Sequence, residues 1–224
     1  MKSGRRVRLL CRTVNGVIAI VLMLLPAFPQ ADAHILDFDV FLNGDPMGSH
    51  RYTLSGSGDR VKVLSEASYR VKVLMVTAWR YTHRSEEVWL KGCLRSIDST
   101  TDENGSDYHV AGKTTAAGLE MNTQDGPRQT NGCVRTFAYW LPELHESKEL
   151  LNAQTGKVEP VTITALEPRP APGQSEFRGG TVWGVRGKGI QIDVWQDGAG
   201  DWYGLASKTP EGRLIEYVRK ETGP

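Results

Sequence analysis

The chain contains little cysteine and none of the common catalytic motifs. Three cysteines occur among 224 residues. None has CxxC spacing, which argues against a cysteine-based zinc site and a thioredoxin-like motif. The sequence contains no nucleophile elbow, no phosphate-binding loop and no HExxH. We therefore expect no metal site and no cofactor, and no motif identifies a reaction.

An excess of charge of either sign is also missing. The chain has 27 basic and 26 acidic residues, and its net charge is +1. Removal of residues 1–33 would leave 22 basic and 25 acidic residues, a net charge of −3. This balance argues against binding to nucleic acid or to an anionic membrane surface. We also expect no transmembrane segment in the mature chain.

The N-terminal 33 residues have the pattern of a secretory signal peptide. Five basic residues begin it, the apolar run Val17–Leu25 follows, and Ala31-Asp32-Ala33 is an A-x-A cleavage site. The apolar run is short for the alternative, a membrane anchor. We predict cleavage after Ala33, a periplasmic or secreted location, and a single mature domain over residues 34–220.

Two cysteines remain after cleavage, Cys93 and Cys133. In an exported chain the expected state of such a pair is a disulfide bond. The alternative is two free thiols.

The stretch from Val61 to His83 organises the rest of the chain. Every second residue from Val61 is mostly apolar, aromatic or small, and most of the intervening residues are charged or polar. Such alternation indicates a strand with one buried face. At about 3.3 Å per residue the run would exceed roughly 70 Å, too long for one straight strand. We expect it to bend or break, in a sheet that curls around its apolar face.

Short alternating segments and polar turns fill most of the remaining sequence. The turn signals include Asn43-Gly44 and Asn104-Gly105. The segment around 141–151 fits one short helix. The predicted fold is therefore all-β, a single-domain antiparallel β-barrel or half-barrel meander with at most one short helix. The other expected strands include residues 36–42, 47–54, 108–115, 158–166, 177–185, 189–195, 202–207 and 214–218.

A hairpin turn at residues 84–86 would bring candidate site residues together. His83 would then lie opposite Glu87, and Tyr81 opposite Trp89. Such an aromatic floor suits a sugar ring or an acyl chain, and a His–carboxylate pair suits acid–base chemistry. A two-residue turn would instead pair His83 with Val88, and an ordinary aromatic core ladder is a further alternative. The predicted ligand-binding residues are Trp79, Tyr81, His83, Glu87 and Trp89, with His83 and Glu87 as candidate catalytic residues.

Other polar groups are weaker candidates. Acidic residues around Asp102 and Asp197 suggest calcium loops, but neither has EF-hand spacing, and both fit turns capped by Asp side chains. His34, as a mature N-terminus, suggests copper chelation with a second histidine.

Several segments resemble a known family. They are His83 with Glu87-Val88-Trp89, Cys93 to Gly105, Phe137 to Trp140, and Leu150 to Gly156. Together they resemble an uncharacterised family of bacterial exported proteins, catalogued only as a domain of unknown function, over about residues 34–220. The resemblance implies an envelope protein with a barrel-like β fold and implies no activity. The architecture also looks like the half-barrels of periplasmic lipoprotein carriers, which is a fold analogy alone.

These observations favour a binding protein over an enzyme. We expect the curled sheet to hold an apolar or amphipathic envelope ligand, a lipid or a glycan, on its concave face. One alternative is an enzyme that modifies an envelope lipid or polysaccharide through His83 and Glu87. The other is a structural partner in an envelope complex.

Overall fold

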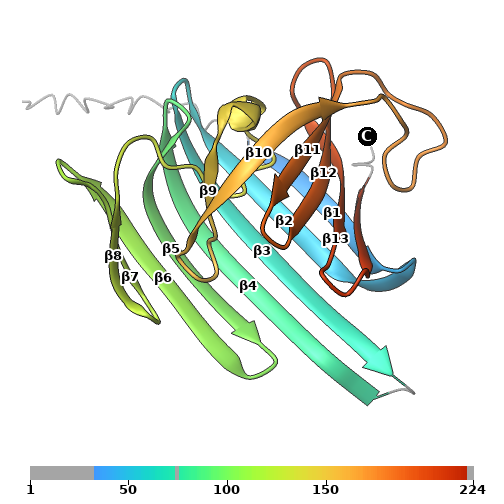
Figure 1. Ribbon diagram of the computed structural model, residues 1–224, viewed down its shortest axis with the longest axis horizontal. Coiled ribbons are helices and arrows are strands. Elements are labelled where there is room, and N and C mark those ends of the chain that lie inside the picture. The colour runs from blue at the N-terminus through green and yellow to red at the C-terminus, as the bar shows by residue number, and fades with distance from the viewer. Residues whose placement is uncertain (1–32, 74–75, 221–224) are drawn as a thin grey trace, which may run out of the picture. The chain divides into compact units, whose positions relative to one another are not determined.

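A computed structural model of the protein describes residues 33–73 and 76–220. Within these ranges the chain forms an antiparallel sheet of fourteen strands (Figure 1). The strands are β1 (His34–Leu42), β2 (Asp45–Ser57), β3 (Arg60–Val73), β4 (Val76–Leu90), β5 (Cys93–Glu103), β6 (Ser106–Thr115), β7 (Gly118–Thr123), β8 (Gly126–Thr130), β9 (Glu149–Leu151), β10 (Val158–Leu166), β11 (Thr181–Gly187), β12 (Ile190–Gln196), β13 (Trp202–Lys208) and β14 (Leu214–Arg219). Apart from Ala33, the predicted signal peptide lies outside the described residues.

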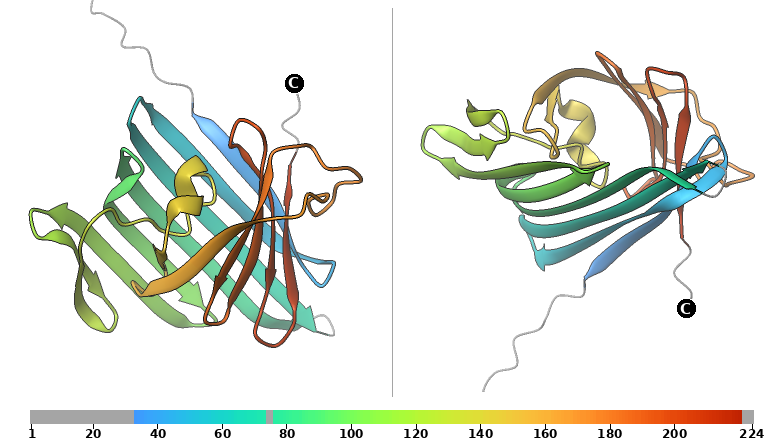
Figure 2. Two further views of the ribbon diagram at one scale, coloured as in Figure 1. Left: turned by 45° about the horizontal axis from the view of Figure 1, so that its top comes forward. Right: turned by 90° about the horizontal axis from the view of Figure 1, so that it is seen from below.

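The order of strands makes the sheet an open meander. Strands that are consecutive in the chain pair with each other, except that β8 and β9 form the two edges. The first strand, β1, pairs with the last, β14, from Phe38–Arg219 to Leu42–Ile215. The sheet curls without closing (Figure 2). The prediction of an all-β antiparallel barrel or half-barrel meander is therefore confirmed.

Residues 131–148, here called the closing segment, connect the two edge strands. The segment lies within the curve of the sheet (Figure 2) and contains the 3-10 helix η1 (Pro142–Glu146). Its backbone is bound to β5 and β9: the Val134 carbonyl accepts the Leu94 N–H at 2.9 Å, and the Arg135 carbonyl accepts the Leu151 N–H at 2.8 Å. The expected short helix around 141–151 is thus a 3-10 helix followed by a strand.

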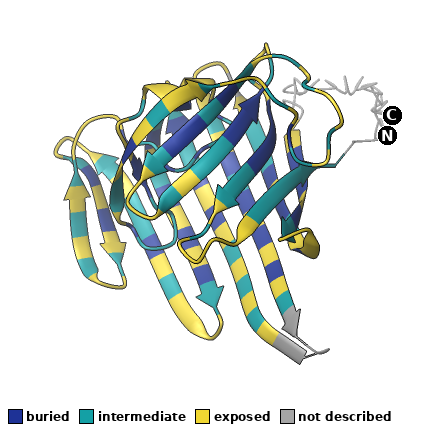
Figure 3. Ribbon diagram, turned by 45° about the vertical axis from the view of Figure 1, so that its right-hand side comes forward, coloured by how far each residue is buried: buried dark blue, intermediate teal, exposed yellow. Residues whose placement is uncertain are grey.

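Alternation decides which residues enter the core. The inward positions in the middle of β3 are buried and most outward positions are exposed, and this alternation gives the banded pattern of Figure 3. The prediction that the odd-numbered residues from Val61 face the interior is confirmed in the described part of β3 and β4. The buried set on β3 is Val63, Ser65, Ala67 and Tyr69.

Large aromatic side chains fill the middle of the core. Phe38 on β1 and Trp202 on β13 are both almost completely buried, and their ring centroids lie 4.2 Å apart. Trp89 on β4 is 1% exposed. Burial of each such side chain is worth about 1.5–3 kcal/mol relative to exposure. The interior face of the sheet is therefore a packed core over much of its length.

The predicted hairpin turn at residues 84–86 is wrong. Strands β3 and β4 pair from Arg60–Leu90 to Val73–Val76, with one register shift between Val71 and Lys72, so the long run reverses between Val73 and Val76. β4 passes straight through residues 84–86. The reason is that alternation persists there: Ser85 points inward and is buried, whereas Arg84 and Glu86 point outward.

The next reversal falls at Lys91-Gly92. Both residues have positive φ, 52° and 67°, as a two-residue hairpin turn of this kind requires. This turn was not among those predicted from the sequence. The two Asn-Gly turns were predicted, and positive φ at Asn43 and Asn104 confirms them.

A disulfide bond joins Cys93 at the start of β5 to Cys133 in the closing segment, as predicted. The two Cα atoms lie 5.0 Å apart across a sequence separation of 40 residues. By loop entropy, such a bond contributes about 4 kcal/mol. Since Cys133 precedes the buried part of the closing segment, the bond fixes that segment to the sheet. No helix in residues 33–73 and 76–220 is long and apolar enough to cross a membrane.

Candidate functional site

The concave side of the sheet borders a cavity of about 250 Å³. Strands β2, β3 and β4 line one side of it, and residues 136–140 of the closing segment and the loop 152–154 line the other. The volume lies just below the range of about 300–1,000 Å³ that is usual for small-molecule sites. Aromatic rings form much of its wall: Tyr52, Tyr69, Tyr81, Phe137, Tyr139, Trp140 and Tyr217.

Three of the predicted ligand-binding residues form one row of rings on β4. The Tyr81 ring stacks on Trp79, with centroids 5.7 Å apart, and lies 6.2 Å from the His83 ring. Tyr69 on β3 stacks on Tyr81 at 5.3 Å. We call Trp79, Tyr81, His83 and Tyr69 the aromatic row. Tyr69, Tyr81 and His83 line the cavity, whereas the half-buried Trp79 extends the row beyond it.

A hydrogen-bonded cluster that the sequence analysis did not select lies beside the aromatic row. His50 Nε2 lies 2.8 Å from Ser65 Oγ, and His50 Nδ1 lies 3.1 Å from Tyr69 Oη. The hydroxyl groups of Tyr69 and Tyr217 are 2.6 Å apart. Burial lowers the pKa of His50 to about 3, so its ring is neutral. We call His50, Ser65, Tyr69 and Tyr217 the polar cluster.

The polar cluster was missed because its members come together only through strand pairing. Tyr217 lies 167 residues from His50, and the β1–β14 pairing brings it to the cavity. His50 and Ser65 do carry a local signal, since they are polar residues at inward positions of alternating strands. A search for such residues would have identified both of them.

Glu87 is a buried carboxyl group at the wall of the cavity. Its side chain accepts hydrogen bonds from Trp89 Nε1 at 2.9 Å, from Ser85 Oγ at 3.3 Å and from Thr136 Oγ1 at 3.4 Å. Burial raises its pKa to about 7, although these donors act in the opposite direction. The group therefore titrates near neutral pH while its oxygen atoms are already hydrogen-bonded within the protein.

His83 and Glu87 do not form the predicted pair. They lie on the same strand, four residues apart, which is about 13 Å at 3.3 Å per residue. His83 stands opposite Ala67 and Thr101, and its Nδ1 lies 2.8 Å from Thr101 Oγ1. Burial lowers the pKa of His83 to about 4. Both groups line the cavity, but no proton passes directly between them.

Trp89 also occupies a different place from the one predicted. It does not stand beside Trp79 and Tyr81, because all three are on one strand. Its ring packs against Trp140 of the closing segment, with centroids 5.2 Å apart and planes at 83°. At 1% exposure, Trp89 is a core residue that positions Glu87 through its indole N–H.

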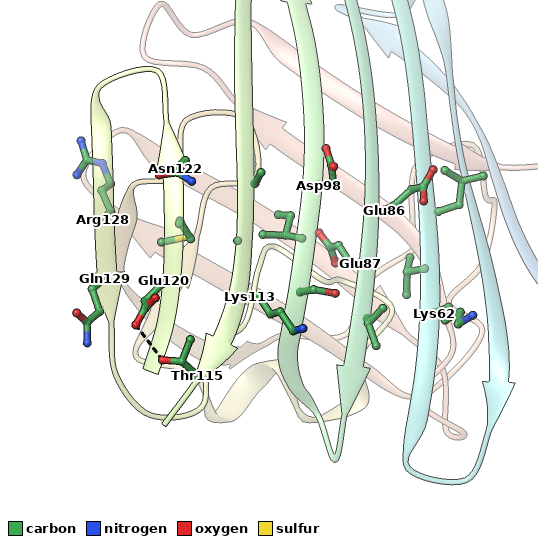
Figure 4. A pocket seen from close by; sticks show the side chains of 18 of the residues that line it. Lys62, Glu86, Glu87, Asp98, Lys113, Thr115, Glu120, Asn122, Arg128 and Gln129 are labelled. Carbon is green, nitrogen blue, oxygen red and sulfur yellow. Dashed lines mark hydrogen bonds between the residues drawn. The ribbon is translucent and has the colours of Figure 1, made fainter. Parts of the chain in front are cut away.

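The opposite, outer face of the sheet carries a larger hollow of about 1270 Å³ over β2–β8 (Figure 4). Exposed charged side chains of both signs lie along it, among them Lys62, Glu86, Asp98, Lys113 and Glu120. Among the described residues that line it, none is aromatic. Solvated charges of mixed sign and the lack of a ring surface favour no ligand class. We therefore assign the candidate site to the interior cavity.

The acidic loops act as turns. Asp102 Oδ1 accepts the Gly105 N–H at 2.7 Å, and Asp197 Oδ1 accepts the Ala199 and Asp201 N–H groups at 2.8 and 3.0 Å. These contacts are those of Asp-capped turns. Within residues 33–73 and 76–220, no three His, Cys, Asp or Glu side chains cluster as metal ligands.

Comparison with known proteins agrees with this fold. A beta-barrel-like protein of Domain of Unknown Function DUF1849 from Brucella abortus has the same fold, with a TM-score of 0.61 at 11% sequence identity. The match covers 86% of this chain and 97% of that one. No curated protein matches the chain. The predicted resemblance to an uncharacterised family is confirmed: residues 38–220 match the model of the family described as Domain of unknown function (DUF6134), and the chain belongs to that family.

Proposed function

We propose that the protein is an exported binding protein that holds an amphipathic envelope ligand, a lipid or a glycan, in its interior cavity. The observation that carries this proposal is the composition of the cavity wall, where aromatic rings alternate with buried, hydrogen-bonded polar groups. Concave sites of this composition, largely apolar with a few placed polar groups, are typical of small-molecule binding.

The bonds that hold the closing segment over the cavity support a preformed site. The closing segment is held to β5 by the disulfide bond and to β9 by a backbone hydrogen bond. Thr136, on the same segment, donates to Glu87 on β4. Because the closing segment is already fixed, the protein loses little conformational entropy when a ligand binds in the cavity.

The N-terminal sequence supports a periplasmic or secreted location. A basic start, the apolar run Val17–Leu25 and the A-x-A site fit export. A disulfide bond also fits an oxidising compartment. The separation of His83 from Glu87 removes the acid–base pair on which an enzymatic function was predicted, so we propose no catalytic role for these residues.

Filling the cavity tests the proposal. Ala67 lies on the inner face of β3, is 6% exposed and lines the cavity. Ala67→Leu adds three carbon atoms to that space. We expect at least a tenfold loss of affinity for the neutral fluorescent probe N-phenyl-1-naphthylamine.

The matched control is Ala111→Leu, on the outer face of β6, which should keep the probe affinity within twofold. Thermal unfolding checks that both variants fold, because overpacking costs about 1–3 kcal/mol. Unchanged affinity in a folded Ala67→Leu variant overturns the cavity as the binding site. If the proposal holds, native mass spectrometry of protein purified from its own envelope should identify a co-purifying ligand.

A further inference from the structure

The polar groups at the cavity offer hydrogen bonds but no fixed charge. Among the described residues that line it, there is no Lys, Arg or Asp. The two histidines are neutral, since burial lowers the pKa of His50 to about 3 and that of His83 to about 4. An anionic head group placed there would lose its hydration without gaining a counter-charge, which costs several kcal/mol.

A cationic head group would also find no available counter-charge in the cavity. Glu87 is the carboxyl group on the cavity wall, and its two oxygen atoms already accept hydrogen bonds from Trp89, Ser85 and Thr136. A cation would have to displace these donors and ionise the carboxyl group in a buried position. The polar cluster instead presents hydroxyl groups and an imidazole ring, which match the hydroxyl groups of an uncharged head.

An apolar surface leads out of the cavity along β3 and β4. The aromatic row continues from His83 and Tyr81 to Trp79, a length of about 13 Å at 3.3 Å per residue. Apolar side chains around its outer end are packed against a second buried cluster but remain half-buried themselves. They are Leu42, Val71, Trp79 and Ile215, beside the buried Val40 and Met47.

This surface is continuous with the cavity but becomes less polar with distance from it. At its inner end the rings stand beside the polar cluster, and at its outer end they stand beside aliphatic side chains. A free sugar would leave the outer end unused, because its hydroxyl groups gain nothing against Val71 and Ile215. A ligand with a polar head and an apolar chain matches both ends.

We infer that the ligand is a single-chain amphiphile with an uncharged, hydroxyl-bearing head, whose head occupies the cavity and whose chain follows the aromatic row to Trp79 and Val71. The inference rests on the proposed function and specifies its ligand class. A single chain is chosen because one row of rings, that of Trp79, Tyr81 and His83, leads out of the cavity.

Three probes separate the head from the chain. Dodecyl maltoside has one chain and a neutral sugar head, of which the glucose unit next to the chain would enter the cavity. Laurate has the same chain length and a charged head, and maltose is a head alone. Isothermal titration calorimetry, below the concentrations at which micelles form, should give dodecyl maltoside at least a tenfold higher affinity than laurate. Maltose should bind more weakly than either.

Variants at the outer end test the path of the chain. Trp79→Ser and Val71→Ser, at facing positions of β4 and β3, should each weaken dodecyl maltoside binding at least fivefold. Two variants are used because one of them could reduce stability, which thermal unfolding detects. Trp183→Ser is the matched control, since Trp183 stacks on His145 and does not line the cavity.

The outcomes distinguish this inference from the proposed function. Laurate binding as tightly as dodecyl maltoside overturns the uncharged head. Equal dodecyl maltoside affinity in the two outer-end variants and the wild type overturns the chain path. In either case, the cavity remains the binding site if Ala67→Leu weakens naphthylamine binding at least tenfold. If naphthylamine binding is insensitive to Ala67→Leu, the proposed function itself fails.

Discussion

Buried titratable side chains on the cavity wall respond to pH in opposite directions. Burial lowers the pKa of His50 from 6.5 to about 3, so its stabilising contribution is present above pH 6.5 and is lost as the pH falls through 3. Burial raises the pKa of Glu87 from 4.5 to about 7. Its contribution is fully present below pH 4.5 and is lost as the pH rises through 7.

Glu87→Gln isolates the contribution of Glu87 to the pH dependence of stability. Glutamine keeps an oxygen atom for the Trp89 indole N–H but carries no titratable proton. As the pH is raised from about 5 to about 8, we expect the free energy of unfolding of the wild type to fall by roughly 2 kcal/mol relative to that of the variant. Urea unfolding at the two pH values measures the difference, in which the histidine contributions cancel.

Glu86→Gln is the control, on the same strand but exposed on the outer face. It should leave the pH dependence as in wild type. A Glu87→Gln variant whose stability follows that of wild type at both pH values would contradict the assignment of Glu87 as a buried, protonated group.

Among the elements, the closing segment forms one side of the candidate site. It provides Thr136 and the residues to Trp140 on the cavity wall, yet it has little regular structure of its own apart from η1. The disulfide bond and the backbone hydrogen bonds to β5 and β9 all hold its first residues, Cys133 to Arg135, and the Gln196 side chain holds the Tyr139 and Leu141 carbonyls. Such a segment is more easily released than a strand in the middle of the sheet.

Removal of the disulfide bond tests its contribution. Replacing both Cys93 and Cys133 with serine should lower the free energy of unfolding by up to about 4 kcal/mol. Hydrogen exchange should accelerate at the Leu94 and Leu151 N–H groups, which donate to the closing segment. Urea unfolding and exchange measured by mass spectrometry check the two effects.

Wild-type protein under reducing conditions is the control, and it should behave like the double variant. Equal urea midpoints for the oxidised wild type and the double variant would show that the other contacts suffice to hold the closing segment.

At the scale of the whole sheet, β1 pairs with β14, so the two edge strands, β8 and β9, come from the middle of the sequence. Open edges invite pairing with other molecules. Here the edge strand β8 is five residues long and contains Pro127, which has no N–H to donate, and β9 is three residues long. An open sheet is therefore compatible with a protein that does not polymerise.

Export is a prediction about the whole molecule. We expect the protein in its native host to begin at His34, because the A-x-A site ends at Ala33. N-terminal sequencing of protein from the periplasmic or secreted fraction checks this. A chain that still starts at Met1 would contradict it, and cleavage lost in an Ala33→Arg variant would support the assigned site.

The sequence by itself determined most of the strands, the two Asn-Gly turns, the inward face of β3 and the partnership of Cys93 with Cys133. These features follow from local patterns: alternation of period two, Asn-Gly turns and a count of two cysteines. The same local reasoning placed a turn at residues 84–86, where charged residues on the outer face looked like a loop. Ladder pairing over the full length of β3 and β4 overrode that signal.

Only the tertiary structure decided which side chains meet in the cavity. The polar cluster joins His50 to Tyr217 through the pairing of the first strand with the last. The closing segment brings Trp140 onto Trp89 and Thr136 onto Glu87. These contacts depend on register and on how the sheet curls, which are set by the burial of the whole inner face together. No local pattern carries that information, because each strand's alternation is equally satisfied by many partners.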